Sequence, residues 1–159
     1  MKKFAVMSGF LGSGKTTLMM SLTKYCSGHY GKAAMISNDL GEGVMLADHK
    51  LAQLSGCRAA QITDECICFC HDVLANKLNA FYDEGCELVV SDIPGFGVGA
   101  LEHVYHGLTE DHPGQFEPAP FTVLIEPYNV KRLRTDTGGD MGTVLDAQLK
   151  EADLIVLNK

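Results

Sequence analysis

A stretch near the start of the chain carries the residue types that bind phosphate groups. Residues 9–17 read Gly-Phe-Leu-Gly-Ser-Gly-Lys-Thr-Thr, and they fit the pattern G-x-x-x-x-G-K-[ST] at every fixed position. Glycines let the backbone wrap closely, so that N–H groups of the loop and of a following helix point at phosphate oxygens. Lys15, which we also expect to be catalytic, can neutralise the β- and γ-phosphates, and Thr16 can place its hydroxyl on Mg²⁺. The expected nucleotide contacts in this loop are Gly9, Gly12, Ser13, Gly14, Lys15, Thr16 and Thr17.

The flanking sequence fits the same interpretation. Residues 4–7 form a short apolar run of the buried-strand type. Side chains at helical spacing then follow the loop, at Leu18, Leu22, Tyr25 and Cys26. Strand, glycine loop and helix is the context that the phosphate-binding pattern requires. The alternative is an ordinary glycine-rich turn that caps a helix, and the matched context argues against it.

A second candidate for phosphate chemistry follows the apolar run 88–91. The sequence there is Asp92-Ile93-Pro94-Gly95, and Asp-x-x-Gly after a strand is what a phosphate-loop nucleoside triphosphatase needs. Asp92 can reach Mg²⁺ through a water molecule and so serve catalysis. The Gly95 N–H can sense the γ-phosphate, so that the loop can switch when this phosphate leaves. Taken alone, the tetrapeptide also fits a plain Pro-Gly turn.

Carboxylates also follow the apolar run 33–37, in the stretch Asn38-Asp39-Leu40-Gly41-Glu42-Gly43. At the carboxyl end of a strand, Asp39 can hold a Mg²⁺-bound water or orient the attacking water, which makes it a catalytic candidate. An Asx-turn that caps the next segment is an equally good interpretation of Asp39. Glu42 has the same two interpretations and a third one, as a ligand of a transition metal.

The sequence ends with Asn158-Lys159, directly after the apolar run 154–157. GTPases carry an Asn-Lys-x-Asp stretch at this place, and its aspartate accepts hydrogen bonds from guanine N1 and N2. Adenine lacks that donor pattern, so such a site separates GTP from ATP. We therefore expect Asn158 and Lys159 to bind nucleotide, and we expect the sequence to be a fragment truncated before the aspartate. The alternative is that Asn-Lys occurs here by coincidence.

Three cysteines at alternate positions, Cys66, Cys68 and Cys70, are followed by His71. In an extended segment, alternate side chains point the same way. Three thiolates on one side can surround a soft metal ion, with His71 or Glu42 completing a tetrahedral set. The alternative is that the cysteines are small buried side chains of a strand, because free cysteine is often buried.

The elements that must position these residues are parallel strands with helices between them. Strands are predicted by the apolar runs at residues 4–7, 33–37, 88–91, 121–125 and 154–157. Near-continuous hydrophobicity is typical of strands buried on both faces of a parallel sheet. Helical spacing recurs in residues 74–81 and 141–149, whereas the proline-rich residues 109–120 predict a surface loop. The alternation predicts an α/β fold, a three-layer sandwich with a mainly parallel central sheet, whose ligands bind beyond the carboxyl ends of the strands.

Length and composition are those of one ordinary domain. The chain has 159 residues, of which 46% are hydrophobic and 21% charged, and its formal net charge is −7. The acidic balance argues against general nucleic-acid binding. No apolar run approaches a membrane span, and the N-terminus lacks the pattern of a signal peptide. We therefore expect a cytoplasmic protein with no membrane partner, whose six cysteines are thiols or metal ligands.

Taken together, the motifs resemble the CobW-like proteins, P-loop GTPases that serve metalloenzyme maturation together with the urease and hydrogenase nickel-insertion GTPases. Residues 9–18 match the family's phosphate loop almost letter for letter, and residues 38–42 resemble its Asn-Glu-Phe-Gly-Glu stretch, with Asp39 in place of glutamate. Residues 61–68 resemble the stretch that ends in Cys-x-Cys-Cys. Residues 148–159 resemble the helix and strand that lead into Asn-Lys-x-Asp.

The resemblance implies the P-loop NTPase fold over residues 1–159 as one GTPase domain, with the family's separate C-terminal domain absent. It implies that GTP and Mg²⁺ bind at the loop and that the cysteine segment binds a transition metal such as Zn²⁺ or Co²⁺. Hydrolysis would then release the metal to a client metalloenzyme or a cofactor-assembly protein, as in cobalamin biosynthesis. A nucleotide-dependent homodimer is implied as well. Two departures bear on this: the third thiol is displaced to Cys70, which alters the metal geometry, and Asp92 stands where the family usually has glutamate.

Two other functions use the same phosphate loop. A small-molecule kinase needs a second substrate pocket and usually a lid with arginines, and the sequence offers Arg58, Arg132 and Arg134. A non-catalytic, nucleotide-gated metal-binding module would bind nucleotide and barely hydrolyse it. Intrinsic hydrolysis in GTPases is often slow, so weak activity alone does not separate these possibilities.

Overall fold

Strands and helices alternate along the chain as the sequence predicts. The computed structural model describes residues 2–38, 40, 45–135 and 140–159, without the side chains of 45–49, 129 and 132–134. In chain order the elements are β1 (Lys3–Ser8), α1 (Lys15–His29), β2 (Ala33–Asn38), α2 (Met45–Leu54), β3 (Arg58–Ile62), α3 (His71–Asp83), β4 (Leu88–Asp92), the π-helix η1 (Leu101–His106), α4 (Gly107–Asp111), β5 (Glu117–Pro118), β6 (Thr122–Ile125), α5 (Pro127–Thr135), α6 (Met141–Glu151) and β7 (Leu154–Leu157). None of the described helices is long and apolar enough to cross a lipid bilayer.

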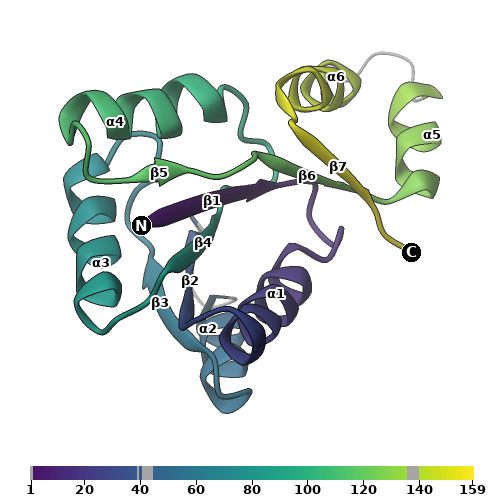
Figure 1. The fold of residues 1–159 in the computed structure, drawn as a ribbon. Coiled ribbons are helices and arrows are strands. Elements are labelled where there is room, and N and C mark those ends of the chain that lie inside the picture. Colours follow the sequence, from purple (N-terminus) through teal and green to yellow (C-terminus); the bar gives the residue numbers. More distant parts are fainter. Residues whose placement is uncertain (1, 39, 41–44, 136–139) are drawn as a thin grey trace.

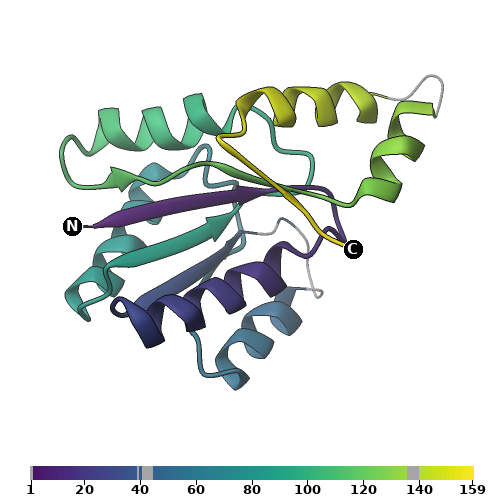
Figure 2. The same ribbon diagram turned by 45° about the vertical axis from the view of Figure 1, so that its right-hand side comes forward.

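The described strands form one sheet in which every pairing is parallel. The strand order is β3-β2-β4-β1-β6-β7, and the two-residue strand β5 pairs with the first residues of β1. Helices lie on both sides of the strands (Figures 1 and 2). The predicted α/β sandwich with a mainly parallel central sheet is therefore confirmed, and five of the strands coincide with the five predicted apolar runs.

Each face of the sheet buries its own apolar layer, because alternate side chains of a strand point to opposite faces. In β1, Phe4 and Val6 join the layer under α3, η1 and α4. Ala5 and Met7, which lie between and after them, join the layer under α1 and α2. Burial on both faces explains why the central strands read as continuous apolar runs.

The strand registers bring the candidate residues together at the carboxyl ends of the strands. Met7 of β1 pairs with Asp92 of β4, and Asn38 of β2 pairs with Ile62 of β3. The Ile93 N–H donates to the Met7 carbonyl oxygen at 3.1 Å. The phosphate loop and the Asp92 loop therefore leave the sheet side by side.

The sequence does not predict β3 or β5. β3 reads Arg-Ala-Ala-Gln-Ile and lies at the edge of the sheet, where only its last residue is fully buried. β5 falls inside residues 109–120, for which the predicted surface loop is wrong in part. α4 extends to Asp111, and Phe116 is buried in the core just before β5. Prolines on both sides of Ala119 prevent a longer strand, because proline has no N–H to donate to the ladder.

Candidate nucleotide and metal site

A cavity of about 550 Å³ lies at the carboxyl ends of the strands, where the phosphate loop and the Asp92 loop meet. Its volume is in the range of small-molecule sites. The lining residues are Leu11, Gly12, Gly14, Lys15, Thr16, Thr17, Asn38, Asp92, Ile93, Pro94, Gly95, Asn158 and Lys159. The cavity thus brings together most of the predicted contacts of the phosphates, of Mg²⁺ and of the base.

The phosphate loop ends at Gly14, which has a φ of 100° directly before the first residue of α1. This is the left-handed region that favours glycine. A Cβ at Gly14 would also collide with the side-chain amide of Asn158. α1 then begins at Lys15, whose ammonium donates to the Gly9 carbonyl oxygen at 2.7 Å across the loop. The cavity thus lies at the N-terminus of α1, and helix N-termini are favourable sites for phosphate groups.

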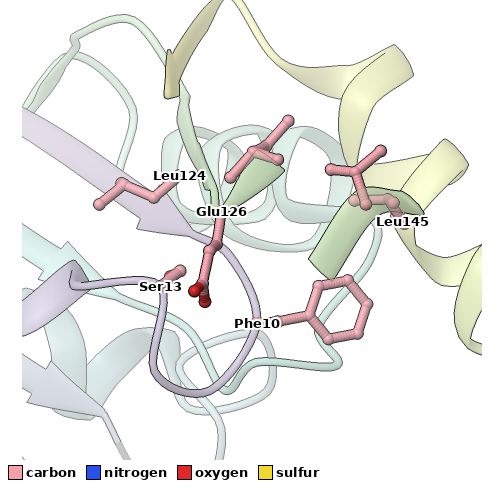
Figure 3. A pocket seen from close by; sticks show the side chains of 7 residues that line it. Phe10, Ser13, Leu124, Glu126 and Leu145 are labelled. Atoms are coloured by element: carbon pink, nitrogen blue, oxygen red, sulfur yellow. The ribbon is translucent and has the colours of Figure 1, made fainter. Parts of the chain in front are cut away.

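Two of the predicted contacts, Gly9 and Ser13, do not line this cavity. The buried Ser13 side chain lines a small pocket of about 10 Å³ on the other side of the loop, where Figure 3 shows it facing Glu126. Gly9 acts through its carbonyl oxygen, which accepts the hydrogen bond from Lys15. Both residues therefore contribute to the conformation of the loop on the side that faces away from the cavity.

The Asp92 loop lies against the phosphate loop. Asp92 is 9% exposed, and its Oδ1 accepts a hydrogen bond of 2.8 Å from the Asn38 N–H. Gly95 comes so close to the phosphate loop that a Cβ there would lie 3.0 Å from the Leu11 nitrogen. Thr16 and Asp92 line the same cavity and offer the oxygen atoms that Mg²⁺ prefers. The residues present therefore fit this ion.

Two side chains of α6, which the sequence does not single out, hold the rest of the Asp92 loop. Gln148 is fully buried, and its Nε2 donates to the carbonyl oxygens of Gly95 and Gly97 at 3.1 and 2.9 Å. The Glu151 carboxylate accepts from the Gly99 N–H at 2.8 and 2.9 Å. These partners lie more than 50 residues away along the chain, so no local pattern could have indicated them.

Asn158 and Lys159 leave β7 beside the phosphate loop. The Asn158 Nδ2 donates to the Ser13 carbonyl oxygen at 2.8 Å, and the Lys159 ammonium donates to the Gly12 carbonyl oxygen. The Asn158 N–H also extends the ladder between β6 and β7 by donating to Ile125. The end of β7 therefore supports the phosphate loop and lines the cavity at the same time.

Residues 66–70 form a turn, so the prediction that this segment is extended is wrong. The Phe69 N–H donates to the Cys66 carbonyl oxygen at 2.9 Å, because the chain must turn from the end of β3 into α3. The turn still brings two thiols together, and the Sγ atoms of Cys66 and Cys68 lie 3.0 Å apart. The Cys70 thiol instead donates to the Cys66 carbonyl oxygen at 3.3 Å.

The short contact polarises the thiol pair. The Cys66 sulfur also accepts the Cys68 N–H at 3.5 Å, so the thiol and the backbone of Cys68 both favour the thiolate form of Cys66. Hydrogen bonding from the Cys68 thiol lowers the pKa of Cys66 to about 6. The same hydrogen bond, together with burial, raises the pKa of Cys68. Burial, with Glu65 and Cys66 nearby, raises the pKa of Cys70. Near neutral pH the turn therefore presents one thiolate, which is the form that binds metals.

His71 is bonded to other groups than the thiols. Its Nδ1 lies 2.7 Å from Oδ2 of Asp111, and its Nε2 lies 2.6 Å from the His103 carbonyl oxygen. Asp39 and Glu42, the remaining candidates, lie outside the described residues. In the described ranges, no three His, Cys, Asp or Glu side chains are grouped so that they could hold a metal ion. The structure therefore brings together Cys66 and Cys68, but not the full predicted ligand set.

Asn38 is a functional candidate to which the sequence assigned no role. It is 1% exposed, and its Nδ2 donates to the carbonyl oxygens of Ile62 at 3.2 Å and Glu65 at 2.9 Å. Its Oδ1 accepts the Ile67 N–H at 3.0 Å. The Asn38 amide thus ties the end of β2 to the cysteine turn. Two signals could have indicated it: its place directly after an apolar run, and its place at the start of the stretch 38–42 that resembles the family's motif.

A parallel sheet, a glycine loop ahead of α1, and Asp-x-x-Gly at the end of the neighbouring strand β4 together define a P-loop nucleoside triphosphatase fold. The family model of the CobW/HypB/UreG nucleotide-binding domain matches residues 3–159, and the chain belongs to this family of P-loop GTPases. The resemblance found in the motifs is thereby confirmed. No protein of curated function matches the sequence.

Solved structures with this fold include two HypB proteins and one further GTPase. HypB from Helicobacter pylori in complex with nickel is 19% identical, with a TM-score of 0.62 over 97% of this chain and 62% of that chain. The hydrogenase maturation factor HypB from Archaeoglobus fulgidus is 21% identical, with a TM-score of 0.59 over 99% and 66%. A Zn(II)-bound triple mutant of the YjiA GTPase is 19% identical, with a TM-score of 0.61 over 100% and 50%. This chain therefore spans between half and two thirds of those proteins, and the likeness concerns the fold.

Proposed function

We propose that this protein binds and hydrolyses GTP with Mg²⁺ and uses the cycle to bind a transition-metal ion and deliver it to a client metalloenzyme or cofactor-assembly protein. One observation carries the proposal. The nucleotide cavity and the Cys66–Cys68 thiol pair lie at the carboxyl ends of strands that are joined in the order β3-β2-β4. The family supports nucleotide binding, and the thiol pair supports metal binding.

The phosphate end of the nucleotide is assigned to the loop before α1. Lys15 contributes its charge and the start of α1 contributes N–H groups. Thr16 and Asp92 would hold Mg²⁺, which when bound neutralises charge on the β- and γ-phosphates. The Gly95 N–H would contact the γ-phosphate and so register its loss. Asp39 stays our proposed residue for orienting the attacking water.

The base end is assigned to Asn158 and Lys159, which line the same cavity. Asn158 braces the loop through Ser13, so it would also hold the phosphate end in register with the base. Selectivity for GTP over ATP is part of the proposal.

The metal ion is the cargo and is assigned to the cysteine turn. The Cys66 thiolate would bind first, and Cys68 would release its proton as the metal binds, since thiolates are the binding form. Thiolate ligands suit Zn²⁺ and also accept Co²⁺. Cys70, His71 and Glu42 are the proposed further ligands, and the first two must leave their present partners to take part. The HypB structure contains nickel and the YjiA structure contains zinc, so the metal of this protein has to be measured.

The test is a metal titration of the reduced protein against a chromogenic chelator, without nucleotide, with GTP and Mg²⁺, and with ATP and Mg²⁺. Binding of Zn²⁺ or Co²⁺ that shifts with GTP and is lost in the double variant Cys66→Ser/Cys68→Ser is expected. The matched control is Cys57→Ser/Cys86→Ser, which changes two buried thiols outside the turn and should leave metal binding intact. Metal binding indifferent to Cys66, Cys68 and nucleotide would overturn the proposal. Phosphate release, measured in parallel, separates a GTPase from a non-catalytic module.

A homodimer that depends on nucleotide is also part of the proposal. Leu11 and Phe96 flank the cavity and are 87% and 60% exposed, and the Phe96 ring packs edge-on against Phe10 with centroids 6.1 Å apart. Large apolar side chains that are exposed to solvent often mark a surface that a partner covers. Light scattering should report twice the monomer mass with GTP and Mg²⁺, and a monomer mass under all conditions would remove this part.

Arg58 gives the kinase alternative no support. It is the first residue of β3, so it lies at the amino-terminal ends of the strands, whereas the cavity lies at their carboxyl ends. Its Nε lies 3.7 Å from the Glu84 carboxylate. Arg132 and Arg134 belong to α5, but their side chains lie outside the described part of the chain.

A further inference from the structure

We infer that Asn38 is a positioning residue that couples the nucleotide site to the cysteine turn, through its backbone on one side and its side chain on the other. The inference rests on the proposed function and names the physical link between its two halves. Asn38 lies at the last residue of β2, between the strand that leads to Asp92 and the strand that leads to the thiols.

The backbone of Asn38 belongs to the nucleotide side. Its N–H donates to Oδ1 of Asp92 at 2.8 Å, and both residues line the nucleotide cavity. This is a buried hydrogen bond to a carboxylate, which is among the stronger kinds in proteins. When the Asp92 loop changes position, Asn38 must move with it or lose this bond.

The side chain of Asn38 belongs to the metal side. Its amide makes three bonds: to the carbonyl oxygens of Ile62 and Glu65, and to the N–H of Ile67. An amide plane is rigid, so these bonds shift as one unit when Asn38 moves. Ile67 stands between Cys66 and Cys68, and a displaced Ile67 N–H changes the separation of the two thiols.

The coupling follows from these contacts without any change elsewhere in the fold. An occupied cavity holds Asp92 in one position, and Asp92 holds Asn38, which sets the thiols at one spacing. After hydrolysis the Asp92 loop relaxes, and the thiols relax with it. Two sites are coupled in this way when the ligands of both shift the equilibrium between two positions of the same element.

The variant Asn38→Ala separates the two sides, because it keeps the N–H that Asp92 accepts and removes the three side-chain bonds. The readout is the ratio of Zn²⁺ affinities with and without GTP and Mg²⁺, taken from the chelator titration. We expect a ratio of about fivefold or more in the wild type, in the usual range of allosteric coupling, and a ratio below about twofold in Asn38→Ala. A variant that binds Zn²⁺ through Cys66 and keeps the wild-type ratio overturns the inference.

The matched control is Tyr82→Phe. It deletes a single hydrogen bond, from the Tyr82 hydroxyl to the Lys3 carbonyl oxygen at 2.8 Å, at the amino-terminal end of β1 and away from the cavity. This control should keep the wild-type ratio, which shows that general loosening of the fold does not produce the effect.

Amide hydrogen exchange in the wild-type protein provides a second test, which does not depend on whether Asn38→Ala folds. The Ile67 N–H is bonded to Asn38, so GTP and Mg²⁺ should change its exchange rate, whereas the Tyr30 N–H at the end of α1 should not respond. An Ile67 rate that is blind to nucleotide refutes the coupling. The proposed function fails on different grounds, namely if the wild type neither hydrolyses GTP nor binds Zn²⁺ through Cys66 and Cys68.

Discussion

At the scale of single residues, Lys15 is the proposed source of positive charge for binding and hydrolysis of the phosphates. Its ammonium already lies across the loop, bonded to the Gly9 carbonyl oxygen. We expect Lys15→Ala to lower the single-turnover rate of GTP hydrolysis by at least about 10²-fold, the usual cost of removing a group that stabilises developing charge. Lys32→Ala is the matched control, because that ammonium donates to Glu84 far from the cavity. Equal rates in both variants would contradict the assignment of Lys15.

The thiol pair predicts a pH dependence. Hydrogen bonding from Cys68 favours the charged form of Cys66, so the pKa of Cys66 falls to about 6. In the metal-free, reduced protein, alkylation of Cys66 by iodoacetamide should therefore rise with pH and reach half its maximal rate near pH 6. Mass spectrometry of the labelled peptide locates the modified sulfur.

The same experiment with Cys68→Ala shows whether the hydrogen bond is the cause. Without the Cys68 donor, the midpoint of Cys66 alkylation should move up toward the value of an ordinary thiol, about 8.5. A midpoint that stays near 6 would locate the cause in another group.

The sequence could predict those functional residues that belong to a short motif with fixed residue types and spacing. The loop from Gly9 to Thr17, Asp92 and the pair Cys66 and Cys68 belong to this class. Asn38 and Gln148 do not, because a buried amide is defined by the groups that other elements bring to it. The spacing alone makes His71 a possible ligand, but in the fold its Nδ1 lies 2.7 Å from the carboxylate of Asp111 at the end of α4.

At the scale of elements, the close approach of the Asp92 loop to the phosphate loop gives a further prediction. A Cβ at Gly95 would lie 3.0 Å from the Leu11 nitrogen and 3.4 Å from the Gly9 carbonyl oxygen, so Gly95→Ala must push the two loops apart. We expect slower GTP hydrolysis, by about 10-fold for each 1.4 kcal/mol lost in the transition state. Gly28→Ala, in α1 with open space around it, should leave the rate unchanged.

Strands were predictable where their residues form an apolar run, which holds for the buried central strands and also for the largely exposed β7. The central strands are apolar along most of their length because they are buried, whereas β3 at the edge of the sheet is mostly not buried and has a mixed composition. The cysteine segment was expected to keep the two-residue period of a strand. It turns instead because α3 starts at His71 and has to pack back on the sheet.

At the scale of the whole molecule, the two apolar layers form the core, while the candidate nucleotide cavity is lined by residues of several elements at the carboxyl ends of the strands. Ligand that binds only the folded protein raises its stability, by about 2.7 kcal/mol at a hundred times the dissociation constant. We expect GTP with Mg²⁺ to raise the melting temperature by several degrees and ATP with Mg²⁺ to raise it less. Lys15→Ala should remove the rise. An equal shift with both nucleotides would refute the proposed selectivity at Asn158 and Lys159.

The class of fold was therefore visible in the alternation of strands and helices, and the family in the motifs placed between them. The arrangement that joins one motif to another was not, since it depends on registers such as Met7 with Asp92 and Asn38 with Ile62. Local patterns of residue types do not show which strands become neighbours.

The run from Gln148 through β7 to Lys159 contacts the loops of the cavity near both of its ends. Gln148 holds Gly95, where the γ-phosphate is expected, and Asn158 holds the loop at Ser13, beside the expected base. Because α6 and β7 connect these two contacts, we expect loss of the γ-phosphate to weaken binding of the remaining diphosphate. We therefore expect the dwell time of a bound diphosphate to depend on the Gln148 hydrogen bonds of α6. Stopped-flow release of a fluorescent diphosphate should accordingly be faster in Gln148→Ala, although that side chain does not line the cavity.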